Sequence, residues 1–184
     1  LTPQPKRDNS WLIGCRFRLT ENCEGDCKQP RKLTFLRNFN VCVKFYSQRE
    51  VRTTVRTLSP IPCSIGQLTH LWHLNLCDCG LKGKIPTEIG KLRNLKFLFL
   101  HDNNFSGRIP TELGRLSRLV WLQLGGDDYT AVALTGTIPT ELGRLSRLQL
   151  LTIVRTNLKG TIPTELCALR HLRHFQALWN DFSC

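Results

Sequence analysis

Apolar residues recur with a fixed period along the second two-thirds of the chain. Aligned on an Ile-Pro step, five segments start at residues 61, 85, 109, 138 and 162, so the period is 24 residues except for one step of 29. A fixed period in this range is typical of stacked supersecondary units. Within each segment the apolar spacing changes from helix-like to the alternation of a short strand. The pattern therefore predicts five stacked coils with one short strand in each.

The second segment, residues 85–108, shows which positions we expect to form the core. Four leucines point into the coil. Along the strand, the residues that alternate with the last two leucines point outward. The inward set is Leu92, Leu95, Leu98 and Leu100, and the outward set is Phe97, Phe99 and His101.

Polar and turn residues occupy fixed places in each segment. Asn103 and Asn180 follow the strand, where a side-chain amide can satisfy backbone groups that the neighbouring coil does not reach. Cys79, Thr156, and Asp127 or a neighbour take this place in the other segments, so the asparagine ladder is interrupted. Glycines mark a second turn, and prolines begin the next segment where no free N–H is needed. They are Gly83, Gly107, Gly136, Gly160, and Pro86, Pro110, Pro139, Pro163.

The consensus LxxLxxLxLxxNxLxGxIP resembles the plant-type leucine-rich repeat of receptor-like kinase ectodomains and polygalacturonase inhibitors. The resemblance covers residues 61–184. It implies an α/β solenoid, a right-handed coil with a short parallel β-sheet on the concave face and an irregular or 3-10 helical convex side. Such solenoids mostly bind other molecules, and the variable strand positions select the ligand.

Residues 1–60 differ from the repeats and are predicted to form an N-terminal cap, because an exposed leucine ladder must be closed at its end. Residues 49–62 resemble a first, degenerate strand with Val51 and Val55 facing inward. Four cysteines in this region permit two disulfides in any of three pairings, or four free thiols in a reducing cell. They are Cys15, Cys23, Cys27 and Cys42. Because the chain holds nine cysteines, at least one stays free or pairs elsewhere.

Composition and charge indicate which cellular setting and which class of partner the chain fits. Hydrophobic residues make up 41% of the chain, but no apolar run reaches the roughly 18 residues of a membrane helix. The chain has no methionine and starts at Leu1 without the apolar core of a signal peptide, so we expect a piece of a longer protein. The net charge of +12 favours an acidic protein or a polyanionic polysaccharide as partner. Nucleic acid is less favoured, because the cations are spread along the sequence without interleaved aromatic residues.

Two other functions, a metal site and an enzyme active site, are less favoured by the sequence than ligand binding. Cys77, Cys79, His73 and His101 have the composition of a zinc site, but Cys79 should point inward and Cys77 outward, so the groups do not converge. No set of Ser, His and Asp occupies one surface column, and the chain lacks a phosphate-binding loop. We therefore expect no catalytic residues, no metal and no cofactor.

The outward strand positions are the candidate ligand-binding surface. Aligned across the coils they form columns that are aromatic in the centre and polar at the edges, as an interface hot spot requires. The candidates are His73, Asn75, Phe97, Phe99, His101, Trp121, Gln123, Thr152, Arg155, His174, Gln176 and Trp179.

The five extra residues of the third segment lie within GGDDYTAVA, residues 125–133, beside Trp121 and Phe99. Insertions in solenoids often fall on the binding face, and this one would form an acidic and aromatic lip of Asp127, Asp128 and Tyr129. A bulge that is merely tolerated is the alternative, since loops cost little to lengthen.

The sequence thus predicts a non-catalytic module that recognises a protein or peptide, in an extracellular or cell-surface protein of signalling or defence, as the resemblance implies. An enzyme inhibitor similar to the polygalacturonase-inhibiting proteins is the second hypothesis. An intracellular structural subunit of a larger assembly is the third.

Overall fold

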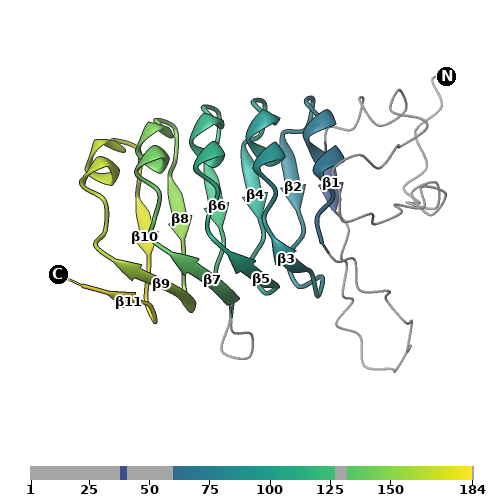
Figure 1. Cartoon of the computed structure of the whole chain (residues 1–184). Coiled ribbons are helices and arrows are strands. Elements are labelled where there is room, and N and C mark those ends of the chain that lie inside the picture. Colours follow the sequence, from purple (N-terminus) through teal and green to yellow (C-terminus); the bar gives the residue numbers. More distant parts are fainter. Residues whose placement is uncertain (1–37, 41–59, 127–131, 184) are drawn as a thin grey trace, which may run out of the picture.

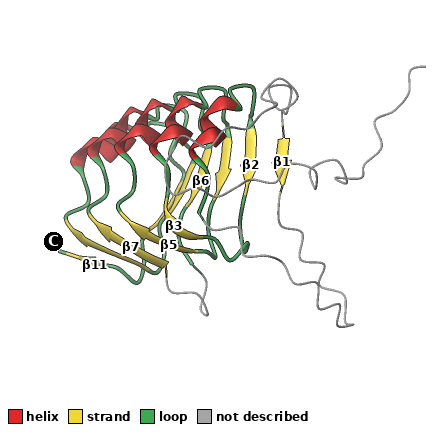
Figure 2. Cartoon of the chain, turned by 45° about the vertical axis from the view of Figure 1, so that its right-hand side comes forward, coloured by secondary structure: helices red, strands yellow, loops and turns green. Residues whose placement is uncertain are grey.

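The computed structural model describes residues 38–40, 60–126 and 132–183, which form a regular right-to-left stack of coils in Figure 1. From residue 61 on, each coil consists of a short 3-10 helix, a strand of a six-stranded parallel sheet and a strand of a five-stranded parallel sheet (Figure 2). The predicted solenoid of parallel strands and 3-10 turns is confirmed.

The six-stranded sheet takes the place expected for the concave strands. Its strands run in the order β1, β2, β4, β6, β8, β10, and every neighbouring pair is parallel and in register. The bounds are β1 Asn38–Asn40, β2 His73–Asn75, β4 Phe97–Phe99, β6 Trp121–Gln123, β8 Leu150–Thr152 and β10 His174–Gln176.

The five-stranded sheet, which the sequence analysis did not predict, forms a second wall of the coils. It is built from the residues around the second-turn glycines, whose positive φ (for example 79° at Gly107) turns the chain toward the next helix. The bounds are β3 Lys82–Lys84, β5 Asn104–Gly107, β7 Val132–Gly136, β9 Thr156–Gly160 and β11 Asp181–Phe182.

The third side of each coil is a 3-10 helix, and a proline in extended conformation stands at the N-cap of every one. Proline fits this place because the first N–H groups of a helix have no partner inside it. The helices are η3 Cys63–Gln67, η4 Thr87–Lys91, η5 Thr111–Arg115, η6 Thr140–Arg144 and η7 Thr164–Ala168.

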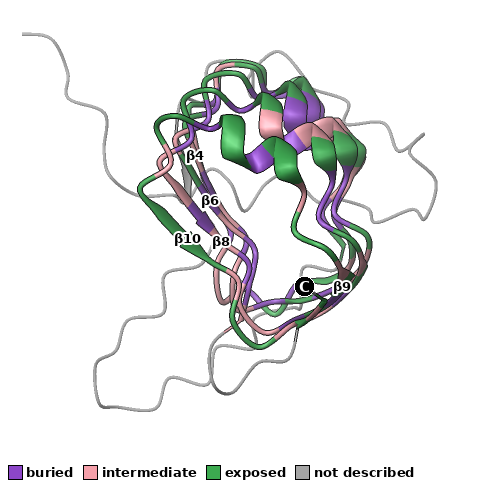
Figure 3. Cartoon of the chain, turned by 90° about the vertical axis from the view of Figure 1, so that its left-hand side faces the viewer, coloured by how far each residue is buried: buried purple, intermediate pink, exposed green. Residues whose placement is uncertain are grey.

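The core is the predicted leucine ladder. Leu92, Leu95, Leu98 and Leu100 are all fully buried, and equivalent residues of the neighbouring coils continue the cluster. Burial fades at the last coil, where strand β10 is exposed on both faces (Figure 3). Ile162 there is 44% exposed, whereas the equivalent Ile138 is 2% exposed beneath the following coil.

Glycine in the 3-10 helices lets neighbouring coils approach closely. A Cβ added to Gly114 would lie 2.4 Å from the carbonyl oxygen of Glu141 in the next coil, and Gly90 and Gly143 are similarly crowded. The last coil has Cys167 at the corresponding place, and its side chain is exposed. Only a residue without a Cβ therefore fits wherever another helix is stacked on top.

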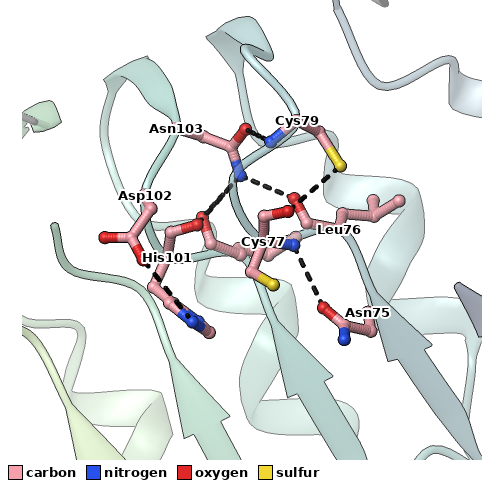
Figure 4. Close-up of polar contacts among 8 residues, drawn as sticks. Asn75, Leu76, Cys77, Cys79, His101, Asp102 and Asn103 are labelled. Atoms are coloured by element: carbon pink, nitrogen blue, oxygen red, sulfur yellow. Dashed lines mark hydrogen bonds and ion pairs between the residues drawn. The ribbon is translucent and has the colours of Figure 1, made fainter. Parts of the chain in front are cut away.

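The buried asparagine performs the role expected of it (Figure 4). Oδ1 of Asn103 accepts hydrogen bonds from the backbone N–H groups of Cys79 and Leu81 in the preceding coil. Its Nδ2 donates to the carbonyl oxygens of Leu76, at 2.7 Å, and Leu100, at 3.0 Å. One side chain thus satisfies backbone groups of two coils.

Asn180 repeats this arrangement three coils further on. Its Oδ1 accepts from the backbone N–H and from Oγ1 of Thr156, and its Nδ2 donates to the carbonyl oxygens of Ile153 and Ala177. Cys79 and Thr156 interrupt the asparagine ladder, and the backbone N–H of each donates to Oδ1 of the asparagine in the following coil. The third-coil position at Asp127 lies outside the described residues.

The N-terminal region is described only in part. Phe39 of β1 lies opposite Leu74, so residues 38–40 supply the strand next to β2. The predicted first strand with Val51 and Val55, and the four candidate disulfide cysteines Cys15, Cys23, Cys27 and Cys42, lie outside the described residues. Within them, no helix is long and apolar enough to cross a membrane.

Candidate ligand-binding surface

The register of the six-stranded sheet brings the outward residues into columns, as the alignment predicted. His73 pairs with Phe97, and Phe97 pairs with Trp121. The second column consists of Asn75, Phe99, Gln123, Thr152 and Gln176. Beyond the strands, the backbone N–H of Asp78 donates to the carbonyl of His101, which keeps the columns aligned into the turn.

Six aromatic and imidazole rings on the first three coils form one connected group. Phe97 is the centre, with its ring centroid 5.2 Å from that of Trp121 and 5.8 Å from those of Trp72 and His73. Phe99 joins His73, Trp121 and His101 at centroid distances of 5.5 to 6.2 Å. Several of these contacts are edge-to-face, the arrangement that the ring quadrupoles favour. We call this group the aromatic cluster: Trp72, His73, Phe97, Phe99, His101 and Trp121.

Exposure is greatest at the two ends of the aromatic cluster. Trp72 is 38% and Trp121 is 42% exposed, whereas Phe97 and Phe99 between them are half-buried. The phenylalanines therefore hold the two indoles at fixed places on a rigid sheet. A partner that covered the cluster would desolvate large apolar surfaces without first having to order them.

Trp72 is a functional candidate that sequence reasoning missed. It precedes the first residue of β2, so it fell outside the outward positions of the strand pattern. Its carbonyl accepts from the backbone N–H of Lys96, which places it in a column with Lys96 and Val120. Adding the residue before each strand to the alignment would have revealed it.

Two imidazole nitrogens of the aromatic cluster are buried without a hydrogen-bond partner among the described residues. They are Nε2 of His73 and Nδ1 of His101. A buried polar atom without a partner carries a desolvation cost, which a ligand that supplies the bond would remove. Burial also lowers the pKa of His73, which favours the neutral ring.

Cys77 lies beside the aromatic cluster as a free, half-buried thiol. Burial, followed by the charges of Asp102 and Asp78, raises the pKa of this thiol. Cys77 is therefore held in the protonated, weakly reactive form.

Cys79 belongs to the buried side of the turn and is disulfide-bonded, as is Cys63. Cys77, Cys79, His73 and His101 thus do not converge on one point. No group of three or more metal-ligating side chains occurs in the described part of the chain.

Some predicted site residues lie away from the aromatic cluster. The Arg155 guanidinium lies 5.2 Å from the ring centroid of Trp179, and this pair occupies the turns of the fourth and fifth coils. His174 and Gln176 are exposed on the last strand, and Gln123 and Thr152 connect the two regions as half-buried members of the second column. The lip residues Asp127, Asp128 and Tyr129 fall outside the described residues.

Comparison with known families gives one clear match. The family described as a leucine-rich repeat region matches residues 61–183 of this chain. A comparison with curated protein sequences gives no match.

Solved structures of plant receptor ectodomains are similar to this chain. One is the GASSHO1/SCHENGEN3 ectodomain from Arabidopsis thaliana in complex with CASPARIAN STRIP INTEGRITY FACTOR 2, 35% identical over 68% of this chain, with a TM-score of 0.62. The SOBIR1 ectodomain from the same plant is 30% identical over 70% of this chain and 68% of its own, with a TM-score of 0.60. The plant peptide hormone receptor RGFR1, in complex with RGF2, is 30% identical over 67% of this chain, with a TM-score of 0.51.

The chain is much shorter than two of these receptors. It spans 14% of the GASSHO1/SCHENGEN3 ectodomain and 23% of RGFR1.

Proposed function

This chain belongs to the leucine-rich repeat family, and we propose that it is a non-catalytic module that recognises a protein or peptide ligand on its six-stranded sheet. The ligand covers the aromatic cluster of the first three coils. The module serves a cell-surface or secreted protein of signalling or defence.

The observation that carries the proposal is the arrangement of the aromatic cluster. Two exposed indoles, Trp72 and Trp121, are held in place by Phe97, whose ring contacts both of them. Tryptophans at the centre of an interface commonly contribute a large share of the binding free energy. A parallel sheet with short strands gives them a rigid support, so little side-chain entropy is lost on binding.

Selectivity in this proposal comes from the imidazoles. Nε2 of His73 and Nδ1 of His101 lie among the rings and lack partners in the described structure. A bound peptide that shifts the surrounding rings and brings a carbonyl, amide or hydroxyl to these nitrogens would complete the hydrogen bonds. An apolar ligand of the same shape would leave both nitrogens unpaired, and it should bind more weakly.

The similar receptors support a peptide ligand over other classes. The GASSHO1/SCHENGEN3 ectodomain is in complex with CASPARIAN STRIP INTEGRITY FACTOR 2, and the peptide hormone receptor RGFR1 is in complex with RGF2. The disulfide-bonded Cys63 and Cys79 support an extracellular setting, because disulfides persist in oxidising compartments.

Selection of a random peptide library, displayed on phage, against the immobilised full chain would test this proposal. Peptides enriched on the wild type should bind Trp121→Ala at least about thirty-fold more weakly, which corresponds to about 2 kcal/mol. Trp179→Ala removes an indole that is 72% exposed but two coils away, and it is the matched control. Unchanged binding to Trp121→Ala, or equal losses in both variants, would contradict recognition at the aromatic cluster.

A further inference from the structure

Arginine and lysine residues that are spread along the sequence are gathered by the fold on one edge of the solenoid. This edge consists of the turns that lead from each 3-10 helix into the next strand of the six-stranded sheet (Figure 1). All of these cations are exposed, and no Asp or Glu occurs in residues 91–97, 115–121, 144–150 or 168–174. We call this the basic edge: Lys91, Arg93, Lys96, Arg115, Arg118, Arg144, Arg147, Arg170 and Arg173.

The charges of the basic edge are not neutralised from within the described part of the chain. None of its cations takes part in an ion pair there. Glu88, Glu112 and Glu141 lie one 3-10 turn before Lys91, Arg115 and Arg144, and each carboxylate accepts a hydrogen bond from the preceding threonine hydroxyl. Among the described residues, these carboxylates form no ion pair with the basic edge, and its other six cations follow the helices in segments without acidic residues.

The backbone holds the cations at a regular spacing. The N–H of Val120 donates to the carbonyl of Lys96 at 2.8 Å, and the N–H of Arg173 donates to that of Gln149 at 2.9 Å. Such bonds join coil to coil, so the rows of cations follow one another at about 4.8 Å, the separation of neighbouring strands. This spacing is shorter than the Debye length of about 8 Å at physiological salt. An extended anion would therefore interact electrostatically with several rows of cations at once.

We propose that the basic edge binds a linear acidic polysaccharide with a carboxylate on each sugar. A straight row of cations fits a polymer whose charges also repeat along a line. Guanidinium groups bind carboxylates in a bidentate manner, and seven of the nine cations are arginines, including all six on the third to fifth coils. The inference does not depend on the proposed peptide site, which occupies the sheet instead of the edge.

Two other polyanions fit the edge less well. Single-stranded nucleic acid gains much of its affinity by stacking bases on aromatic rings, but the exposed indoles near the edge, Trp72 and Trp121, are confined to the first and third coils. On the fourth coil, residues 144–150 include none of the large exposed hydrophobic side chains, and on the fifth coil the nearest one is Phe175, two residues after Arg173. An anionic membrane would therefore lack a continuous apolar anchor along that half of the edge.

The test uses polygalacturonate as the probe and measures its affinity for the full chain by calorimetry at low and physiological salt. Arg115→Gln, Arg144→Gln and Arg147→Gln together should weaken binding about tenfold or more and flatten its salt dependence. Lys82→Gln, Lys84→Gln and Lys159→Gln together remove the same charge from exposed positions of the five-stranded sheet, and they should change the affinity by about twofold or less. All six side chains are exposed, so circular dichroism should show both triple variants folded.

Several outcomes would overturn the proposal. Equal losses in the two triple variants would mean that only the net charge attracts the polymer. Retained binding of fully methyl-esterified polygalacturonate would exclude carboxylate recognition. Stronger edge-dependent binding of a DNA oligonucleotide or of anionic vesicles would assign the basic edge to a different class of partner.

Discussion

The backbone N–H of Cys79 donates to Oδ1 of Asn103 at 3.1 Å, although the two residues are 24 positions apart in the chain. The bond joins the turn of one coil to the turn of the next. Asn103 is 2% exposed, so water cannot replace it.

Replacing Asn103 with alanine should lower the free energy of unfolding by about 3 kcal/mol, because buried N–H and carbonyl groups of two coils would lose their partner. Chemical denaturation measures this loss. Asn104→Ala, at the exposed neighbouring position, is the control and should cost less than about 0.5 kcal/mol. Equal midpoints for the two variants would mean that the asparagine ladder contributes nothing to stability.

Leu98→Ala should cost about 2 to 5 kcal/mol of unfolding free energy, because it opens a cavity in a fully buried ladder. Phe97→Ala, one residue earlier on the outward face, should cost clearly less, since its ring is half-buried and packs against side chains of the aromatic cluster. The comparison is made by thermal melting of both variants. A larger loss for Phe97→Ala would be inconsistent with a core built from the leucines alone.

Gly114→Ala should destabilise the solenoid by about 1 to 3 kcal/mol, the usual cost of overpacking. The added methyl group would meet backbone atoms of Glu141, which cannot move without separating two coils. Cys167→Ala, at the corresponding exposed position of the last coil, should be close to neutral. Urea midpoints of the two variants check the prediction, and a neutral Gly114→Ala would show that the coils can separate at little cost.

The stability of the protein should fall in mildly acidic solution, partly through His73. Burial lowers the pKa of His73 in the folded chain, so the unfolded chain takes up the proton more readily. The contribution of the neutral ring is complete above the ordinary histidine pKa of about 6.5, and it is lost as the pH falls through that value toward the folded pKa. Melting temperatures between about pH 7.5 and pH 5 should therefore drop less for His73→Phe than for the wild type. Identical pH profiles would show that the ring is as well solvated in the folded chain as in the unfolded one.

Most of the fold could be predicted from the sequence because local rules decide it. The spacing of Leu92, Leu95, Leu98 and Leu100 is compatible with one inward face only, since a slip of one residue would exchange the two faces of the strand. Pro110 and Gly107 prescribe backbone conformations that few other residues adopt as easily, so the turns on either side of the helices were also predictable. The pairing of Phe97 with Trp121 followed from the period alone.

The features that only the tertiary structure revealed all arise from the stacking of one coil on the next. The strand of residues 38–40 has no repeat signature, and its place next to β2 is fixed by pairing with residues 35 positions away. The five-stranded sheet arises because the turn residues of successive coils come within hydrogen-bonding distance, which no single coil requires. Trp72 joins the aromatic cluster because its ring reaches Phe97 on the neighbouring coil, and the basic edge exists because the coils place distant turns side by side. A repeat thus determines its own coil through local sterics and burial, whereas the surfaces that bind other molecules are shared between coils and appear only when the coils are stacked.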